Sequence, residues 1–461
     1  MGTKDQDGTA MLASNDDVAR VSDIGALKQS SDWRQAVISE WKARRAADPP
    51  SSLLFPLAAN PFGEDEIVAM ADVLLSGRLT MAEHVNRAEQ AFAKAVGSPY
   101  AVMVNSGSSA NLLAVAAIVN KLRKSGTFLV PGDEVLVPAV CWSTSVFPLI
   151  QLGLKPVFVD VDPVTFNSTV SEMEKRMNPR VKAVMAVHVL GNSTDMAELT
   201  DFVARHGLVL VEDTCEALGT FCTAKDGGRK MLGTCGDFGT YSFYFSHHIT
   251  SGEGGMVTCK TEDDFNLLRC LRAHGWTRHL TNKAEVEAEY PLVDSRFLFV
   301  NVGFNVRPLE VQAAMLNVQL PKLTEFNACR RSNLSRFQAI LEADARVHDI
   351  MTLMKPARGT DPAWFGISAV LNATYKHQLR DYLTYLYAHG VENRPIISGN
   401  FVRQPCIAAF IDGVDSPDKF PGAETLHTRG FFIGVHQLHI PDATLDKLVD
   451  IMLSFKFVSA S

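Results

Sequence analysis

Two adjacent histidines lie in a segment whose surroundings suggest chemistry. The stretch from Thr240 to Met256 reads TYSFYFSHHITSGEGGM, with a hydroxyl at Ser242, imidazoles at His247 and His248, and a glycine-rich run after them. An imidazole can move protons near neutral pH because its ordinary pKa is about 6.5. His247, five positions after Ser242, is the candidate base, and His248 is its candidate supporting residue. Without further context, an ordinary pair of histidines in a loop is the favoured explanation.

A second segment has the features of a phosphate site. NSGSSANLL, at 105–113, follows an apolar run and opens a helical pattern. Unpaired amides at a helix start favour an anion, so Gly107 and Ser108 are candidate phosphate contacts. The Ser242 hydroxyl can add to them. A plain turn followed by a helix cap is the alternative reading of these small residues.

Three more side chains stand where strands are expected to end. Asp213 closes the β-rich run in VEDTCEALG and supplies a carboxylate. Trp142, in PAVCWSTSV, can stack on an aromatic ring, although a tryptophan is more often core. His188, in VHVLGN, can lie near the same ligand, and a structural histidine is the favoured alternative.

The elements that must position these residues alternate along the chain. Short β-rich runs at 101–104, 134–138, 156–161, 183–187 and 208–212 are separated by helical patterns. Two amphipathic helices precede them, ending at Gly77 and Gly97. This alternation predicts an α/β fold, with a mostly parallel sheet and helices on both faces. Such sheets bind ligands at the carboxyl ends of their strands.

The chain divides into four predicted parts. Residues 1–30 form a disordered or peripheral tail, 31–55 a helical extension, 56–320 a large domain, and 321–461 a smaller α+β domain. The boundary of the smaller domain is expected in the helical stretch around 307–340. Beyond it we expect a strand at 364–370, a helix at 376–389, a strand at 391–396 and a last helix from about 442.

Composition excludes several classes of protein. The 461 residues are 46% hydrophobic and 21% charged, as in ordinary globular proteins. A net charge of −7 gives no reason to expect nucleic acid or an anionic membrane as partner. No apolar run reaches the length of a membrane span, and the start does not resemble a secretory signal. The eight scattered cysteines predict reduced thiols of a cytoplasmic protein.

Together these segments carry a family resemblance. NSGSSAN, VEDTCEALG, GDFGTYSFYFSHHITSGEGG, GFNVRPLEVQAA and FFIGVHQLHIP follow in order from about residue 55 to the C-terminus. The chain resembles the sugar aminotransferases and dehydratases of the fold type I enzymes that use pyridoxal phosphate (PLP). The resemblance implies an aspartate-aminotransferase-like fold with a seven-stranded sheet. In this family His247 stands where a lysine would bind PLP covalently, which marks the nucleotide-sugar 3-dehydratases.

Cysteine spacing separates two subclasses of these dehydratases. The CDP-sugar 3-dehydrases hold a [2Fe–2S] cluster on four cysteines, including a C-x-C pair after the histidine. This sequence keeps Cys215 but has no such pair, so no cluster and no metal are expected. LRAHGWTR, EYPLVDSRFLFVNVGFNVR and GNFVRQP resemble instead the cluster-free GDP-4-keto-6-deoxymannose 3-dehydratases, enzymes of deoxysugar and O-antigen synthesis.

The resemblance implies a reaction that begins with pyridoxamine phosphate (PMP). His247 would remove a proton from the cofactor and help expel the C3 hydroxyl of a nucleotide-linked 4-keto-6-deoxyhexose. Asp213 would hold the pyridine nitrogen protonated, Glu216 would lie near the ring, and Trp142 would stack on it. L-Glutamate would recharge the cofactor, leaving 2-oxoglutarate, and the sugar's amine would leave as ammonia.

The resemblance also implies a homodimer with shared active sites. Asn305, in GFNVR, would reach the cofactor phosphate of the neighbouring subunit. Candidates for binding the anions of the substrate or of glutamate, with surface ion pairs as the alternative, are Arg272, His274, Arg307, Arg394 and Arg403.

Two other functions remain open from the sequence. One is a cluster-type CDP-4-keto-6-deoxyglucose 3-dehydrase, or another nucleotide-sugar dehydratase or aminotransferase. The other is a degenerate aminotransferase homologue that only binds a ligand. The intact Asp213, Trp142, Ser108, Ser242 and GEGG argue against a degenerate site.

Overall fold

A computed structural model describes residues 31–47, 53–58 and 61–458. These residues belong to two compact units, Met1–Pro50 and Ser51–Ser461. In the first unit, helix α2 spans Ser31–Ala47 and has Arg44 and Arg45 in its last turn. It lies within the predicted helical extension. The predicted tail, residues 1–30, lies outside the described residues.

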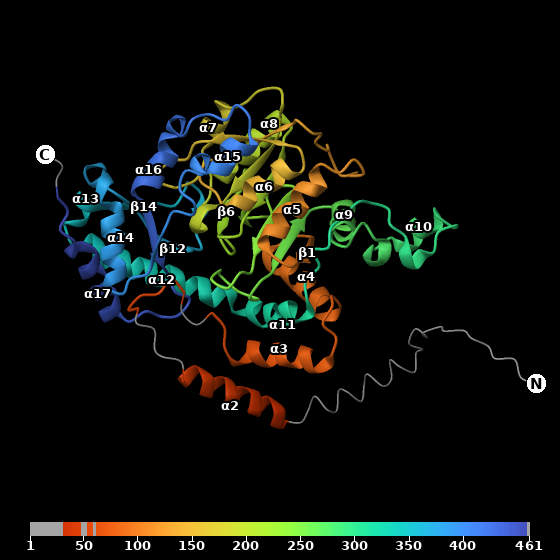
Figure 1. Cartoon of the computed structure of the whole chain (residues 1–461), viewed down its shortest axis with the longest axis horizontal. Helices are drawn as coiled ribbons and strands as arrows, with labels where there is room; N and C mark the ends of the chain where they lie inside the picture. Colours follow the sequence, from red (N-terminus) through yellow and green to blue (C-terminus); the bar gives the residue numbers. More distant parts are fainter. Residues whose placement is uncertain (1–30, 48–52, 59–60, 459–461) are drawn as a thin grey trace, which may run out of the picture. The chain divides into compact units, whose positions relative to one another are not determined.

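The second unit is built on a seven-stranded sheet in the order β1-β9-β8-β5-β4-β2-β3 (Figure 1). Four of its six neighbouring pairs are parallel, and the two pairs that involve β9 are antiparallel. This confirms the predicted α/β class. The strands are β1 (Tyr100–Val104), β2 (Glu134–Pro138), β3 (Lys155–Val159), β4 (Val181–Val187), β5 (Val209–Asp213), β8 (Phe238–Ser242) and β9 (Gly255–Cys259).

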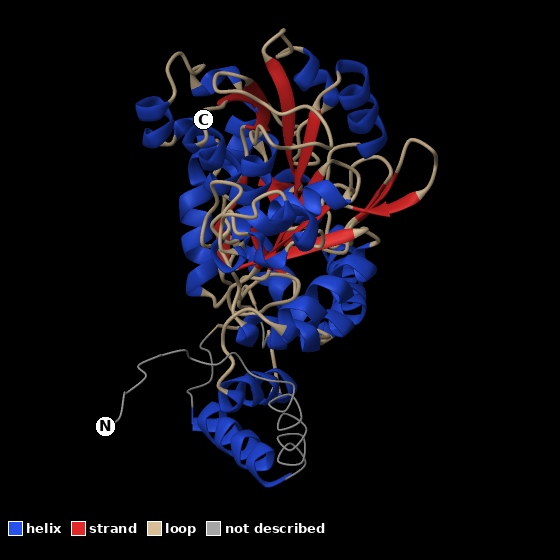
Figure 2. Ribbon diagram, turned by 90° about the vertical axis from the view of Figure 1, so that its right-hand side faces the viewer, coloured by secondary structure: helices blue, strands red, loops and turns tan. Residues whose placement is uncertain are grey.

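Helices cover both faces of this sheet, as Figure 2 shows. Along β1, Val102 packs in one core cluster with helix α5, whereas Met103 packs in another with α4. Along β5, Val211 and Leu210 face opposite sides in the same way. Burial on both faces explains why strands such as β2 are continuous apolar runs rather than alternating patterns.

The two helices of the second unit that precede β1 end at the glycines that the sequence predicted. Gly77 and Gly97 end α3 and α4 in the left-handed conformation, with φ of 70° and 78°. The α-helices before the second sheet are α3 (Glu64–Ser76), α4 (Glu83–Val96), α5 (Gly107–Ile118), α6 (Ser143–Gln151), α7 (Val170–Glu174), α8 (Met196–His206), α9 (Glu262–Arg272), α10 (Lys283–Ala288), α11 (Glu310–Gln319), α12 (Leu323–Glu342) and α13 (Val347–Ile350).

A second, four-stranded sheet has the order β10-β12-β14-β13 and lies in the part predicted as the smaller domain. Its strands are β10 (Met351–Leu353), β12 (Gly366–Leu371), β13 (Asn393–Pro395) and β14 (Gly430–Gly434). The helices around it are α14 (Leu379–Ala388), α15 (Pro405–Phe410), α16 (Pro421–Arg429) and α17 (Asp442–Ser454). A three-stranded sheet joins β11 (Thr360–Asp361), β6 (Phe221–Thr223) and β7 (Arg229–Met231).

Several predicted boundaries differ from the observed ones by one to three residues. Strand β3 ends at Val159 rather than 161, and the carboxylate of the next residue, Asp160, accepts hydrogen bonds from the N–H groups of Gly422 and Ala423. The helix expected from 376 begins as α14 at Leu379. A 3₁₀ turn over Ala373–Gln378 precedes it.

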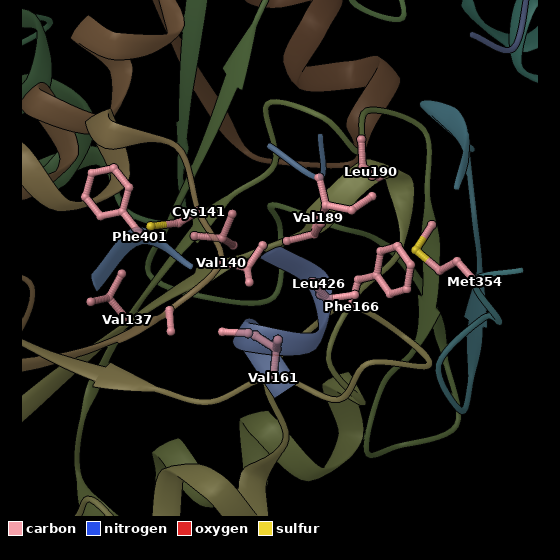
Figure 3. Close-up of a cluster of buried hydrophobic side chains, with 14 of the residues drawn as sticks. Val137, Val140, Cys141, Val161, Phe166, Val189, Leu190, Met354, Phe401 and Leu426 are labelled. Atoms are coloured by element: carbon pink, nitrogen blue, oxygen red, sulfur yellow. The ribbon is translucent and has the colours of Figure 1, made fainter. Parts of the chain in front are cut away.

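A buried apolar cluster supports the loops at the carboxyl ends of β2 and β4 (Figure 3). Val140 and Cys141 follow β2, and Val189 and Leu190 follow β4. Side chains from the C-terminal part of the chain complete the cluster, namely Met354, Phe401 and Leu426. These loops carry Trp142 and His188, so the core fixes the region in which the candidate site was predicted.

Candidate active site

The predicted site residues gather at the carboxyl ends of the central strands. Asp213 ends β5, Ser242 ends β8, and Gly107 opens α5 shortly after β1. Trp142 and His188 follow β2 and β4. Ligand sites in open α/β sheets form at this edge.

The Asp213 carboxylate is buried and held by three donors. Its Oδ2 accepts hydrogen bonds from Asn111 Nδ2 and from Ser145 Oγ, both at 2.7 Å. Its Oδ1 accepts the N–H of Cys215 at 3.2 Å. None of these donors is charged, so no cation among them competes with a further partner for the carboxylate. A protonated pyridine nitrogen is a partner of this kind.

Gly107 lies against Ser242 at the start of α5. A side-chain carbon added to Gly107 would lie 2.5 Å from Cβ of Ser242 and 2.8 Å from its Oγ. Only glycine therefore fits there, and the backbone of the helix start comes close to the Ser242 hydroxyl. Ser106 caps the helix by accepting the Ser109 N–H, and Ser108 is exposed. Backbone amides, two hydroxyls and a helix N-terminus form a suitable cradle for a phosphate.

His247 is half-buried and uncharged. Its Nδ1 lies 3.3 Å from the main-chain oxygen of Ser242, and its ring packs edge-on against Phe365 at 5.3 Å between centroids. A carbonyl only accepts hydrogen bonds, so Nδ1 carries the hydrogen and Nε2 keeps a lone pair. Burial lowers the pKa of His247 to about 4, although the charge of Asp213 acts in the opposite direction. At neutral pH this imidazole can therefore accept a proton.

The neighbouring His248 has a different environment. It is buried, and its Nε2 donates to the main-chain oxygen of Ala363 at 2.7 Å. Burial and the charge of Arg330 lower its pKa well below the ordinary value. This bond joins the His248 segment to the chain just before β12, which is a structural role.

Glu216 is held beside the site by an unusual turn. Its Oε2 accepts the N–H of Leu190 at 3.0 Å, and Leu190 has a left-handed φ of 53°. Burial, together with the negative charge of Asp213, raises the pKa of Glu216 to about 7, although the bond from the Leu190 N–H acts in the opposite direction. Glu216 can therefore gain or lose a proton near neutral pH.

Trp142 and His188 take contrasting positions. The Trp142 side chain is 58% exposed, so a ring face is available for stacking. His188 is buried, with Nε2 3.2 Å from Oε2 of Glu212. Burial alone would raise the pKa of Glu212, but its bonds with His188 and with backbone N–H groups lower it. His188 thus has a structural partner in Glu212, which agrees with the favoured alternative from the sequence, a structural histidine.

The arginine predictions need correction. Arg272 is 1% exposed, and its Nη1 binds Glu89 and the main-chain oxygen of Met103, so it is structural and not a substrate contact. Arg403 forms a two-pronged surface ion pair with Glu424, at 2.7 and 2.6 Å. That ion pair is the alternative interpretation that the sequence allowed.

The other substrate candidates remain accessible. Arg394 pairs with Glu392 on the surface, at 2.9 Å. His274 is exposed and has a φ of 66°. Nε of Arg307 donates to Oδ1 of Asn305 at 2.9 Å, and Asn305 is itself exposed. The Asn305 side chain is thus oriented by its neighbour.

Sequence reasoning missed Asn111, Ser145 and Glu212. Asn111 lies one turn into α5 and Ser145 in the first turn of α6, so both look like ordinary helix residues in the sequence. Their spacing could have indicated Asn111 and Ser145, because each follows a candidate ligand residue by three or four positions.

Two classes of site are absent from the part of the chain that the structure describes. No group of three or more His, Cys, Asp or Glu side chains there is arranged to hold a metal ion. Within the same residues, no helix has the length and apolar character needed to cross a membrane.

The chain is similar to proteins of known activity. It is 36% identical over 390 residues to the GDP-4-keto-6-deoxy-D-mannose 3-dehydratase of Yersinia pseudotuberculosis, covering 84% of this chain and 95% of that protein. The structure of the E. coli GDP-4-keto-6-deoxy-D-mannose-3-dehydratase with bound hydrated PLP matches with a TM-score of 0.77 and 35% identity, over 87% of this chain and 99% of that one. A structure of GDP-4-keto-6-deoxymannose-3-dehydratase with a trapped adduct of PLP and glutamate matches with a TM-score of 0.76 and 35% identity, over 86% and 100% of the two chains.

A family comparison agrees with these similarities. Residues 61–453 match the model of the DegT/DnrJ/EryC1/StrS aminotransferase family. This match covers all three sheets and every predicted cofactor residue. The chain therefore belongs to the DegT/DnrJ/EryC1/StrS aminotransferase family.

Proposed function

We propose that this protein is a PLP- and PMP-dependent 3-dehydratase of nucleotide-linked 4-keto-6-deoxyhexoses. Its favoured substrate is GDP-4-keto-6-deoxymannose, with L-glutamate as amino donor and with 2-oxoglutarate and ammonia released. The observation that carries this proposal is an uncharged imidazole, His247, at the end of the strand that supplies Ser242. The similarity to the 3-dehydratases of Y. pseudotuberculosis and E. coli supports the sugar and the nucleotide.

The residues of the site fit the cofactor. The amides of Gly107 and Ser108 and the hydroxyl of Ser242 would hold its phosphate, close to where Gly107 leaves no room for a side chain. Asp213 would bind the pyridine nitrogen, and Trp142 would stack on the ring. When bound, PMP supplies an amine for the sugar's keto group and a ring that accepts electrons.

His247 performs the proton transfers. Its Nε2 would take a proton from carbon C4′ of the cofactor and deliver one to the departing C3 hydroxyl, which would leave as water. An imidazole cannot bind the cofactor covalently, so His247 stays available as an acid and base during the whole reaction. Glu216 lies close enough to Asp213 for their charges to interact. With a pKa of about 7, it would exchange a proton near the cofactor at neutral pH.

A second copy of the chain would complete the site. Exposed apolar side chains run through the segment that leads to Asn305, with Leu292 99% and Val302 89% exposed. Figure 1 shows α10, at the start of this segment, extending away from the sheet. Large exposed apolar areas of this kind are typical of protein interfaces. A homodimer in which Asn305 reaches the partner's cofactor phosphate would cover them.

Two further features belong to the proposal. The protein would act in the cytoplasm, in the synthesis of deoxysugars such as those of the lipopolysaccharide O-antigen. It would work without an iron–sulfur cluster.

The direct test supplies purified protein with PLP, glutamate and, separately, the GDP-, CDP- and dTDP-linked 4-keto-6-deoxyhexoses. Mass spectrometry of the sugars should show loss of one oxygen atom, most rapidly from the GDP-linked sugar. Faster turnover of the CDP- or dTDP-linked sugar would contradict the nucleotide assignment. Binding without turnover of any sugar would favour a degenerate, ligand-binding homologue.

A further inference from the structure

We propose that Asn111, Ser145 and Thr240 form a positioning network that aims the Asp213 carboxylate at the pyridine nitrogen of the cofactor. The inference rests on the proposed function, because it concerns the same cofactor. It adds three residues that act through Asp213 and do not touch the cofactor themselves.

Two of the residues hold one oxygen of the carboxylate. Asn111 Nδ2 and Ser145 Oγ both donate to Oδ2 of Asp213, each at 2.7 Å. Asn111 comes from α5 and Ser145 from α6, so two helices fix the carboxylate from outside its own strand. Asn111 and Ser145 are 1% and 0% exposed, so water does not compete for these bonds.

Thr240 sets the orientation of the Asn111 amide. Its Oγ1 donates to Oδ1 of Asn111 at 2.6 Å, and it is the residue of β8 that lies directly beside Asp213 in the sheet. An ionised carboxylate can only accept hydrogen bonds, so the amide nitrogen must face Asp213 and the amide oxygen must face the hydroxyl. Turning the amide over would place two acceptors, the amide oxygen and Oδ2 of Asp213, against each other.

The network is neutral throughout. An amide, a hydroxyl and the N–H of Cys215 contact the carboxylate. A cation at the same place would compete with the ring nitrogen for the negative charge, whereas neutral dipoles fix the direction of the carboxylate and leave its charge available. The titratable groups on which that charge acts are Cys141, Cys215, Glu216 and His247.

The role of the network is therefore to keep the ring nitrogen protonated. A carboxylate that can turn away, or that takes up a proton itself, stabilises the pyridinium less. Loss of any network bond should shift the titration of the ring nitrogen to lower pH. A residue that merely fills space would change folding stability and leave this titration where it is.

The test follows the ¹⁵N chemical shift of the pyridine nitrogen of ¹⁵N-labelled PLP bound to the full-length protein, as a function of pH. Asn111→Leu and Ser145→Ala should each lower the pH of half-protonation by about one unit, the effect of losing one hydrogen bond to a charged group. Thr240→Val should lower it by less, and Thr240→Ser, which keeps the hydroxyl, should restore the wild-type value.

A matched control separates this effect from loss of stability. The Thr258 hydroxyl on β9 is also buried and donates to the main-chain oxygen of Gly233 at 2.6 Å, away from Asp213. Thr258→Val should lower the melting temperature about as much as Thr240→Val does, with no change in the nitrogen titration.

The outcomes distinguish the network from the proposed function. Wild-type titration curves in all network variants that bind PLP would overturn the network while leaving the dehydratase proposal intact. The network would also be overturned if Thr258→Val shifted the titration of the ring nitrogen as much as Thr240→Val does. Failure of the wild-type protein to bind PLP would overturn both.

Discussion

His247 donates a hydrogen bond from Nδ1 to the main-chain oxygen of Ser242, over 3.3 Å. Ser242, whose hydroxyl we propose as a phosphate contact, therefore also sets the tautomer of the proposed base. Its other nitrogen, Nε2, keeps the lone pair that a general base needs. The pKa of about 4 leaves this nitrogen unprotonated at neutral pH.

Replacing His247 with Asn should abolish loss of the C3 hydroxyl, because the proton acceptor is removed. The value of kcat should fall by about 10²–10⁴-fold or more. Binding of PLP should persist, since the phosphate and ring contacts remain. His248→Asn is the matched control. It should lower the free energy of unfolding by about 1–3 kcal/mol through its lost bond to Ala363 and retain turnover. The opposite pattern would make His248 the base.

The cofactor should bind without a covalent link to the chain. Borohydride treatment of PLP-loaded wild-type protein should give no pyridoxyl-labelled peptide, because imidazole forms no reducible imine. The His247→Lys variant is the positive control and should give a labelled peptide that contains position 247. A labelled lysine elsewhere in the wild-type protein would show that the cofactor binds at another place.

Glu216 should make stability depend on pH. Its folded pKa of about 7 lies above the ordinary value of 4.5, so the folded protein holds a proton that the unfolded chain releases. This group therefore makes the free energy of unfolding fall as pH rises from about 4.5 to 7. Glu216→Gln should match the wild type at pH 4 and exceed its stability at pH 8, by at most about 3 kcal/mol. Chemical denaturation of cofactor-free protein at both pH values checks this; equal stability at pH 8 would argue against the raised pKa.

Arg272 should matter for folding rather than for substrate binding. Arg272→Met leaves the buried Glu89 carboxylate without its cation and should cost about 3–5 kcal/mol of stability in denaturant unfolding. Arg403→Met breaks only a surface ion pair with Glu424 and should cost at most about 1 kcal/mol. A raised KM with unchanged stability in Arg272→Met would restore its interpretation as a substrate contact.

The fold could be predicted from the sequence because burial on both faces produces strands that are apolar throughout. The predicted strand over 134–138 is β2 to the residue, and Asp213 lies at the end of β5. The partners of site residues could not be predicted in this way. Glu89 and Arg272 are 183 residues apart, and only the fold brings them together. Asn111 and Ser145 reach Asp213 from helices whose sequences show nothing unusual.

We propose that His247 makes this family member a dehydratase. The most direct test measures the sugar product, ammonia, 2-oxoglutarate and iron together, with purified protein, PLP, glutamate and GDP-4-keto-6-deoxymannose. We predict a sugar with one oxygen atom fewer and no nitrogen, one ammonia and one 2-oxoglutarate per sugar, and no iron. Nitrogen retained in the sugar would make the protein an aminotransferase, and stoichiometric iron or a need for a reductase would place it among the cluster-bearing enzymes.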